Sequence, residues 1–198
     1  PYGTQTVLGT QEHLKNPSIT NIKNYQKTYY VPNNMAICLS GDFDPDEMVA
    51  VIEKYFGQMQ PNKDLPEITL TTSSVIDSPA EKDVYGLDAE NVMIGWKYPG
   101  AKSEDALVAE VAASVLYNGS AGLIDLNINQ QQTVLEADGM SYSRPDAGEL
   151  ILMGNPKQGQ TLEEVRDILL AEVAKLRNGE FDDAVLSGTV NNMKKMMM

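Results

Sequence analysis

Val92-Met93-Ile94-Gly95-Trp96-Lys97-Tyr98 is the stretch that decides the fold class. Its bulkiest apolar residues stand at every second position, which is the period of a β-strand with one buried face. Soon after it, Ser103-Glu104-Asp105 supplies a helix cap and two acidic first-turn residues, and Asn118-Gly119 ends the apolar helical spacing. The stretch therefore predicts a half-buried strand followed at once by a helix.

The residues that follow predict two more strands, adjacent to each other in sequence. Segments 133–141 and 148–154 indicate a hairpin, after a short helix at 123–128. Thr161-Leu162-Glu163-Glu164 is a capping box that starts a helix, and a last helix begins at Phe181. Because consecutive strands pair antiparallel and the other segments are helical, we expect an α+β fold, an antiparallel sheet with helices packed on one face.

The first quarter of the chain predicts two helices around a short strand. Ser18 or Thr20 caps the first helix, which ends before Pro32. Asp44-Pro45-Asp46-Glu47 starts the second, because it combines an N-cap, a proline at the first helical position and a glutamate three residues after the cap. Residues 35–40 are typical of a buried strand. The apolar residues expected in the core here are Tyr25, Tyr29, Tyr30, Met48, Val49, Ile52, Tyr55 and Phe56.

Prolines and hydroxyl residues mark a boundary between the two halves. Pro61, Pro66 and Pro79 surround a Thr-Thr-Ser-Ser run, which is typical of a linker with one short strand near residues 68–70. We therefore expect the end of one domain at 1–60, a linker at 61–80 and a second domain at 81–198. The chain opens on Pro1 and stops inside a predicted helix, so we interpret it as an internal piece of a longer protein.

The composition excludes several classes of function. The 198 residues carry 15 basic and 28 acidic side chains, and the formal net charge of −13 opposes binding to nucleic acids or anionic membranes. No apolar run approaches the roughly 18 residues that a membrane span needs. With one cysteine and one histidine, the chain forms no internal disulfide and no site that needs two histidines.

Two motif-like segments have simpler structural interpretations. Gly154-Asn155-Pro156-Lys157-Gln158-Gly159-Gln160-Thr161 has the glycine spacing of a phosphate-binding loop, but Gln160 replaces the essential lysine. A calcium-loop spacing occurs at Asp42, Asp44, Asp46 and Glu53. That loop needs a glycine at its sixth position, where this chain has Glu47. We expect an ordinary strand–turn–helix connection in the first case and helix-capping carboxylates in the second.

Single reactive side chains also favour structural roles. His13 has no second histidine to share a metal with, and we expect it to be solvated or hydrogen-bonded locally. Cys38 is expected to be buried and inert within its apolar strand. Asn118-Gly119-Ser120 is a glycosylation sequon only in a host that uses it. The residues therefore supply no catalytic, cofactor-binding or metal-binding site.

One set of short segments resembles a known family. In order, these segments are Pro1-Tyr2-Gly3, Leu8-Gly9-Thr10, Ile19-Thr20, Tyr29-Tyr30-Val31-Pro32-Asn33-Asn34-Met35, Gly41-Asp42-Phe43-Asp44 and Tyr55-Phe56-Gly57. Together they resemble the pitrilysin/insulinase-type zinc metallopeptidases, which include the mitochondrial processing peptidases. The resemblance is specific over about residues 1–57 and continues more weakly over 80–198, with Gly119-Ser120-Ala121-Gly122-Leu123 after the strand and helix of a second domain.

The resemblance implies a scaffold role rather than a catalytic one. Such peptidases hold zinc in an inverted H-x-x-E-H motif with a downstream glutamate. This chain cannot contain that motif with one histidine, and Glu12 and His13 do not match its spacing. The resemblance therefore places zinc in the parent protein, upstream of Pro1, and none on this chain. It implies a clamshell of homologous α+β domains around a chamber for peptide or unfolded polypeptide.

Two interpretations of the parent protein remain open at this point. It is an active zinc endopeptidase, with this chain as part of its scaffold, or a non-catalytic family subunit that binds peptides or a partner. The implied partners are polypeptide substrate and the rest of the parent chain or a homologous subunit. A third, unrelated interpretation is a free-standing interaction domain. The resemblance suggests a bacterial periplasm or envelope without establishing the compartment.

Overall fold

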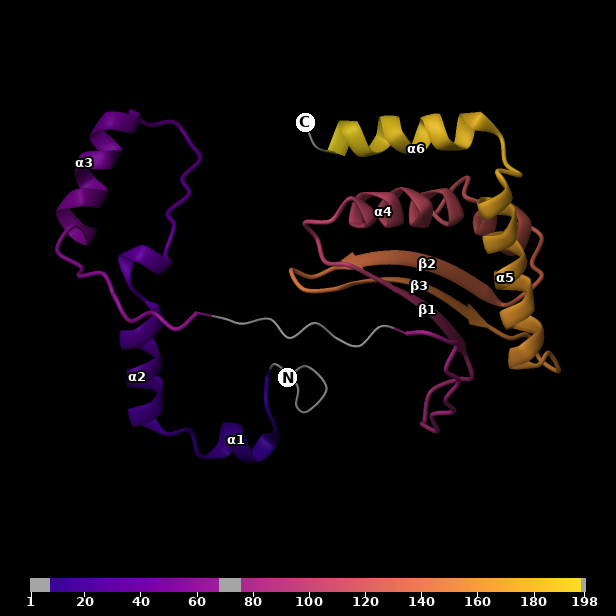
Figure 1. Cartoon of the computed structure of the whole chain (residues 1–198), viewed down its shortest axis with the longest axis horizontal. Helices are drawn as coiled ribbons and strands as arrows, with labels where there is room; N and C mark the ends of the chain where they lie inside the picture. Colours follow the sequence, from indigo (N-terminus) through magenta and orange to yellow (C-terminus); the bar gives the residue numbers. More distant parts are fainter. Residues whose placement is uncertain (1–7, 68–75, 197–198) are drawn as a thin grey trace. The chain divides into compact units, whose positions relative to one another are not determined.

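The computed structural model describes residues 8–67 and 76–196, and its chain divides into two compact units, Pro1–Thr69 and Leu70–Met198 (Figure 1). Unit 1 contains α1 (Gln11–Lys15), α2 (Ile19–Tyr29), the short 3₁₀ turn η1 (Pro32–Asn34) and α3 (Pro45–Phe56). Unit 2 contains β1 (Val92–Tyr98), α4 (Glu104–Leu116), the π-helical turn η2 (Asp125–Asn129), β2 (Glu136–Ser143), β3 (Gly148–Asn155), α5 (Leu162–Asn178) and α6 (Asp183–Met196).

Unit 2 is built on a three-stranded antiparallel sheet in the order β1-β3-β2. The hairpin strands β2 and β3 pair with Gly139 opposite Leu152, and β1 adds to the other side of β3 with Ile94 opposite Leu152. α4 packs on all three strands, and α5 packs on β1, β3 and α4. α6 lies over α4 as a second layer (Figure 1). The predicted α+β fold, with an antiparallel sheet and helices, is confirmed.

The core of unit 2 lies between the sheet and these helices. Leu152 of β3 is completely buried in this core, and Val92, Ile94 and Trp96 of β1 pack against the core cluster. The residues of β1 that alternate in the sequence therefore point in turn into this core and to the opposite face of the sheet. The other buried members of the cluster are Leu116, Leu123, Ile124, Ile128, Val134, Ala137, Val165 and Leu169.

Helix boundaries in both units follow local capping signals. The Asp44 carboxylate accepts hydrogen bonds from the backbone N–H groups of Asp46 and Glu47 at the start of α3. Thr161 and Glu164 form the predicted reciprocal capping box at the start of α5. Gly179 ends α5 in the left-handed conformation, at φ 70°, which glycine adopts without steric cost. The two starts, at Asp44 and Thr161, are as the sequence predicts, because these caps need no distant contact. The end of α5 lies two residues beyond the predicted Leu176.

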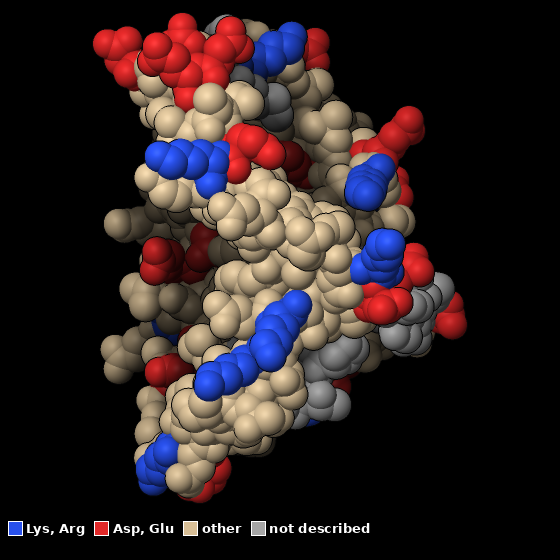
Figure 2. Space-filling model, turned by 90° about the vertical axis from the view of Figure 1, so that its left-hand side faces the viewer, with Lys and Arg blue, Asp and Glu red and all other residues tan. Residues whose placement is uncertain are grey.

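Unit 1 has helices but almost no core. Val31 is the only buried residue among the described residues of this unit, and α1, α2 and α3 bury none. Figure 2 shows acidic side chains gathered at one end of a largely uncharged face. The first turn of α3 contains the acidic residues Asp46 and Glu47. Helices of this length gain most of their stability from packing of an apolar face, so these faces need a cover.

Several expectations for unit 1 are wrong for the chain as described. Residues 35–40 form no strand, because no other strand lies beside them among residues 8–67. Cys38, expected to be buried, is exposed. The helix residues expected in the core are half-buried or exposed, with Tyr25 at 60% and Tyr55 at 68%. A local pattern predicts which face is apolar, but burial depends on a second element. The strand expected near residues 68–70 lies outside the described residues.

Candidate functional surface

The face of the sheet opposite α4 and α5 is the most distinctive surface of unit 2. Cross-strand pairing places its side chains in three rows, each contributed by β1, β3 and β2 in turn. We call this surface the open face. Its residues are Met93, Met153 and Asp138 in the first row, Gly95, Ile151 and Met140 in the second, and Lys97, Glu149 and Tyr142 in the third.

The middle of the open face is apolar. Met93 is 58% exposed and Met140 49% exposed, and Ile151 and Met153 lie half-buried beside them on the central strand. Gly95 contributes no side chain, so Ile151 is left uncovered on the β1 side. A Cβ added at Gly95 would meet only the carbonyl oxygen of Leu150, at 4.0 Å. The result is an apolar strip across the middle of the open face.

One end of the open face is acidic. Asp138 and Glu136 stand two residues apart on β2 and therefore on the same face. The Asp138 Oδ1 atom is buried and has no hydrogen-bond partner within the described residues. Burial, followed by the nearby charge of Glu136, raises the pKa of the Asp138 carboxyl above its ordinary value. The carboxylate at this position is therefore held in an unfavourable environment.

Neutralising Asp138 is expected to stabilise unit 2 at neutral pH. The pKa of Asp138 is raised in the folded chain, so the folded state keeps this proton longer as the pH rises above 3.8. Stability is therefore lost as the pH rises from 3.8 through the raised pKa. We expect Asp138→Asn to raise the Tm at pH 7 by up to about 3 °C.

The fluorescence of Trp96, the single tryptophan of the chain, follows unfolding of unit 2 directly. The Tm advantage of Asp138→Asn should shrink as the pH is lowered toward 4. Asp88→Asn makes the same charge change at an exposed position and should leave Tm unchanged. An equal Tm for Asp138→Asn and the unsubstituted chain at pH 7 would contradict the expected cost of the carboxylate.

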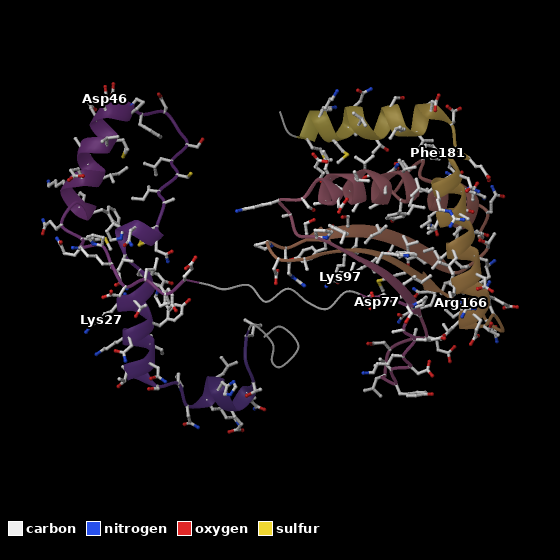
Figure 3. All side chains as sticks on the ribbon, in the orientation of Figure 1. Lys27, Asp46, Asp77, Lys97, Arg166 and Phe181 are labelled. Carbon is white, nitrogen blue, oxygen red and sulfur yellow. The ribbon has the colours of Figure 1, made fainter. Side chains whose placement is uncertain are left out.

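The opposite end of the open face carries both charges and an aromatic ring. The Arg144 guanidinium lies 4.9 Å from the Tyr142 ring centroid and 4.0 Å from the Glu149 carboxylate. Lys97 is on the same side of the sheet, away from α4 (Figure 3). These exposed pairs contribute little stability. They make this end of the open face polar and mixed in charge.

The buried carboxylates of unit 2 have structural partners. Asp125 Oδ2 accepts hydrogen bonds from the backbone N–H groups of Asn118 and Gly122, at 3.0 and 2.9 Å. Glu172 accepts from the Asn127 amide at 2.8 Å and the Lys175 ammonium at 2.7 Å. Because these acceptors already hold donors within the fold, they organise the loop after α4 and its contact with α5.

The motif-like segments are also used within the fold. The Gln160 amide donates to the Thr133 carbonyl, and its oxygen accepts from the Lys157 N–H, so this side chain closes the turn before α5. The Glu164 carboxylate already accepts the Thr161 N–H there. The Asn118 amide donates to the Ser114 carbonyl at 2.9 Å, which places the sequon side chain inside a loop network. These contacts support the structural interpretations made from sequence.

The metal-ligating residue types do not converge in the part of the chain that the structure describes. No group of three or more His, Cys, Asp or Glu side chains there could hold a metal ion. His13 Nδ1 accepts the Thr10 N–H at 3.2 Å and so caps α1. These residues therefore do not fit a catalytic zinc. No described helix has the length and apolar character to cross a membrane.

The chain is similar to known proteins over most of its length. A model of the peptidase M16 inactive domain matches residues 18–193, which is most of the chain. The chain belongs to the peptidase M16 family. The resemblance to pitrilysin/insulinase-type peptidases is therefore confirmed, and the chain is a non-catalytic part of a protein of this family. The interpretation as an unrelated domain is excluded.

Individual M16 relatives agree with this assignment. The zinc protease PqqE of Helicobacter pylori is 21% identical over 198 residues, covering 96% of this chain and 44% of that protein. An uncharacterized zinc protease of Mycobacterium leprae is 28% identical over 141 residues, covering 69% of this chain and 30% of that protein. The crystal structure of a protease from Helicobacter pylori has the same fold, with a TM-score of 0.75, 19% identity and coverage of 96% of this chain and 47% of that one. The chain thus spans less than half the length of these relatives.

The open face was not identified from sequence. The alternation in β1 separates Met93 and Gly95 from the core residues, but it does not show what the neighbouring strands place beside them. Met140, Ile151 and Met153 join them only through the register of the hairpin. The sequence would have revealed the open face only if the hairpin turn had fixed the register between β2 and β3.

Proposed function

We propose that this chain supplies the scaffold and part of the substrate chamber of a zinc-dependent endopeptidase of the M16 family. Catalysis would then be carried by residues upstream of Pro1. The observation that carries the proposal is the match of residues 18–193 to the family's inactive domain, in a chain with a single histidine. The lack of a converging ligand set among residues 8–67 and 76–196 supports it.

In this proposal the chain contains parts of two homologous domains. Residues 1–60 are the end of the first, catalytic-type domain, 61–80 are the linker and 81–198 are most of the second domain. The bare helices of unit 1 support this division, because a domain portion that buries only Val31 among its described residues needs further elements to cover it. The partners are the rest of the parent chain or a homologous subunit, and the substrate is peptide or unfolded polypeptide.

Zinc content and peptide cleavage test the proposal. The purified 198-residue chain is expected to bind no stoichiometric zinc and to cleave no peptide. The longer protein encoded with its upstream sequence is expected to contain H-x-x-E-H and a later glutamate and to hold one zinc. It should cleave unfolded polypeptide, lose activity with a chelator and regain it when zinc is added. Metal analysis by mass spectrometry and cleavage of a quenched fluorescent peptide provide the measurements.

Two results would change the assignment. Tight one-to-one zinc on the 198-residue chain would show that a ligand set exists here and would contradict the proposal. A longer protein with the family pattern but without zinc or cleavage would favour the alternative, a non-catalytic family subunit that serves as a peptide-binding or partner scaffold.

A further inference from the structure

We propose that the open face of the unit 2 sheet binds an extended polypeptide segment that carries apolar side chains next to a lysine or arginine. The inference rests on the proposed function and names the substrate class that this wall of the scaffold would select. It starts from the two sides of the sheet. α4 and α5 cover one side, whereas the methionine-rich side is exposed among the described residues.

The apolar strip of the open face suits side chains of varied shape. Met93, Met140 and Met153 are unbranched and flexible, and Ile151 lies between them on β3. Methionine adapts its rotamers to different apolar partners and is frequent on surfaces that bind many sequences. Because Gly95 leaves the β1 side of Ile151 open, a ligand side chain can reach Ile151 there.

The negative charge at the acidic end of the open face favours a basic residue next to the apolar side chains of the ligand. Asp138 shares its row with Met93 and Met153, and the exposed Glu136 stands two residues away on the same face. A lysine or arginine side chain would bring the opposite charge to this acidic end. A second copy of this chain is a poorer occupant, since it brings the same carboxylates and a net charge of −13.

The test is a titration of the 198-residue chain carrying ¹³C-methyl methionine with end-blocked synthetic peptides. One peptide has a run of valine and leucine followed by lysine, a second has glutamine in place of the lysine, and a third has serine in place of the apolar residues. We expect the lysine peptide to shift the methyl resonances of Met93, Met140 and Met153. The resonances of Met48 and Met59 in unit 1 should not move. The serine peptide should not bind.

Substitution of Gly95 tests the apolar strip itself. Gly95→Lys covers the strip without a clash in the fold, because only one atom lies within 4 Å of the new Cβ. It should weaken the Kd for the lysine peptide at least about tenfold, the value of one buried apolar side chain. Gly86→Lys adds the same charge where nothing lies within 4 Å and should change the Kd less than about twofold. Met93→Gln is a second variant that removes apolar surface without adding bulk.

Asp138→Asn tests the charge selection. The unsubstituted chain should prefer the lysine peptide over the glutamine peptide by about fivefold, as expected for a partly exposed ion pair. Asp138→Asn should remove this preference and keep binding of the apolar run. Asp88→Asn is the matched control and should keep the preference.

Each other outcome overturns the inference in a distinct way. Equal binding by Gly95→Lys, shifts confined to Met48 and Met59, or no binding of the lysine peptide would each exclude the open face as the site. Methyl shifts that depend on protein concentration without peptide would identify a second copy as the occupant. A further outcome is that the 198-residue chain binds the lysine peptide at the open face and the longer protein does not. The rest of the parent chain, rather than substrate, would then be the occupant of the open face. None of these results bears on zinc or cleavage by the longer protein, so the proposed function is tested separately.

Discussion

Replacing Leu152 by alanine is expected to destabilise unit 2 by about 2–5 kcal/mol. Leu152 is completely buried at the centre of β3, with Ile94 on one side and Gly139 on the other. A Cβ at Gly139 would lie 2.6 Å from Leu152 Cδ2, so the leucine side chain occupies the space that glycine leaves free. Because no side chain at position 139 can move into the cavity, most of the cavity should remain.

Denaturant unfolding followed by Trp96 fluorescence measures the cost of Leu152→Ala within unit 2. Met93→Ala is the matched control on the other side of the same sheet, where the side chain is 58% exposed. Its effect should stay within about 0.5 kcal/mol. Equal losses for the two variants would contradict the assignment of the core to the helix-covered side.

Gly148→Ala is expected to cost about 1–3 kcal/mol, whereas Gly95→Ala should be neutral or mildly stabilising. A Cβ at Gly148 would collide with the Tyr98 ring, which crosses this position on the core side of the sheet. The Tyr98 hydroxyl is 2.6 Å from Ser141 Oγ and 2.9 Å from Ser143 Oγ on β2. Moving the ring would therefore break hydroxyl contacts that join the two outer strands across β3.

A double-mutant cycle separates the steric clash from a general preference for glycine. If the collision with Tyr98 is the cause, Gly148→Ala should cost much less in a Tyr98→Ala background. The comparison again uses Trp96 fluorescence, with denaturant midpoints for all four chains. An unchanged cost in that background would place the cause in the backbone rather than in the ring.

Elements whose signals are local could be predicted closely. The capping residues of α3 and α5 and the alternation of β1 each lie within a few residues, so the chain encodes them without distant contacts. The absence of the H-x-x-E-H zinc motif could also be predicted, because a chain with one histidine cannot contain a motif that needs two. The phosphate-loop and calcium-loop resemblances also failed for local reasons that the structure supports.

Burial and the candidate surface could not be predicted in the same way. Residues 35–40 and the apolar faces of α2 and α3 have the patterns of a core, yet they are largely exposed among the described residues, because a pattern cannot supply its own cover. Cys38 is exposed for the same reason. In unit 2 the helices α4 and α5 provide the cover, and the strands are therefore half-buried as expected.

By itself, the sequence determined the α+β class, the capped starts of α3, α4 and α5, the family resemblance and the absence of the two-histidine motif. Each depends on residue types at short spacing. Only the tertiary structure decided which apolar residues are core and which form the open face. The register of β2 and β3 brings Met140, Ile151 and Met153 beside Met93, although up to 60 residues separate them in the chain. A surface of this kind is made by pairing between distant segments, and pairing is a property of the folded sheet.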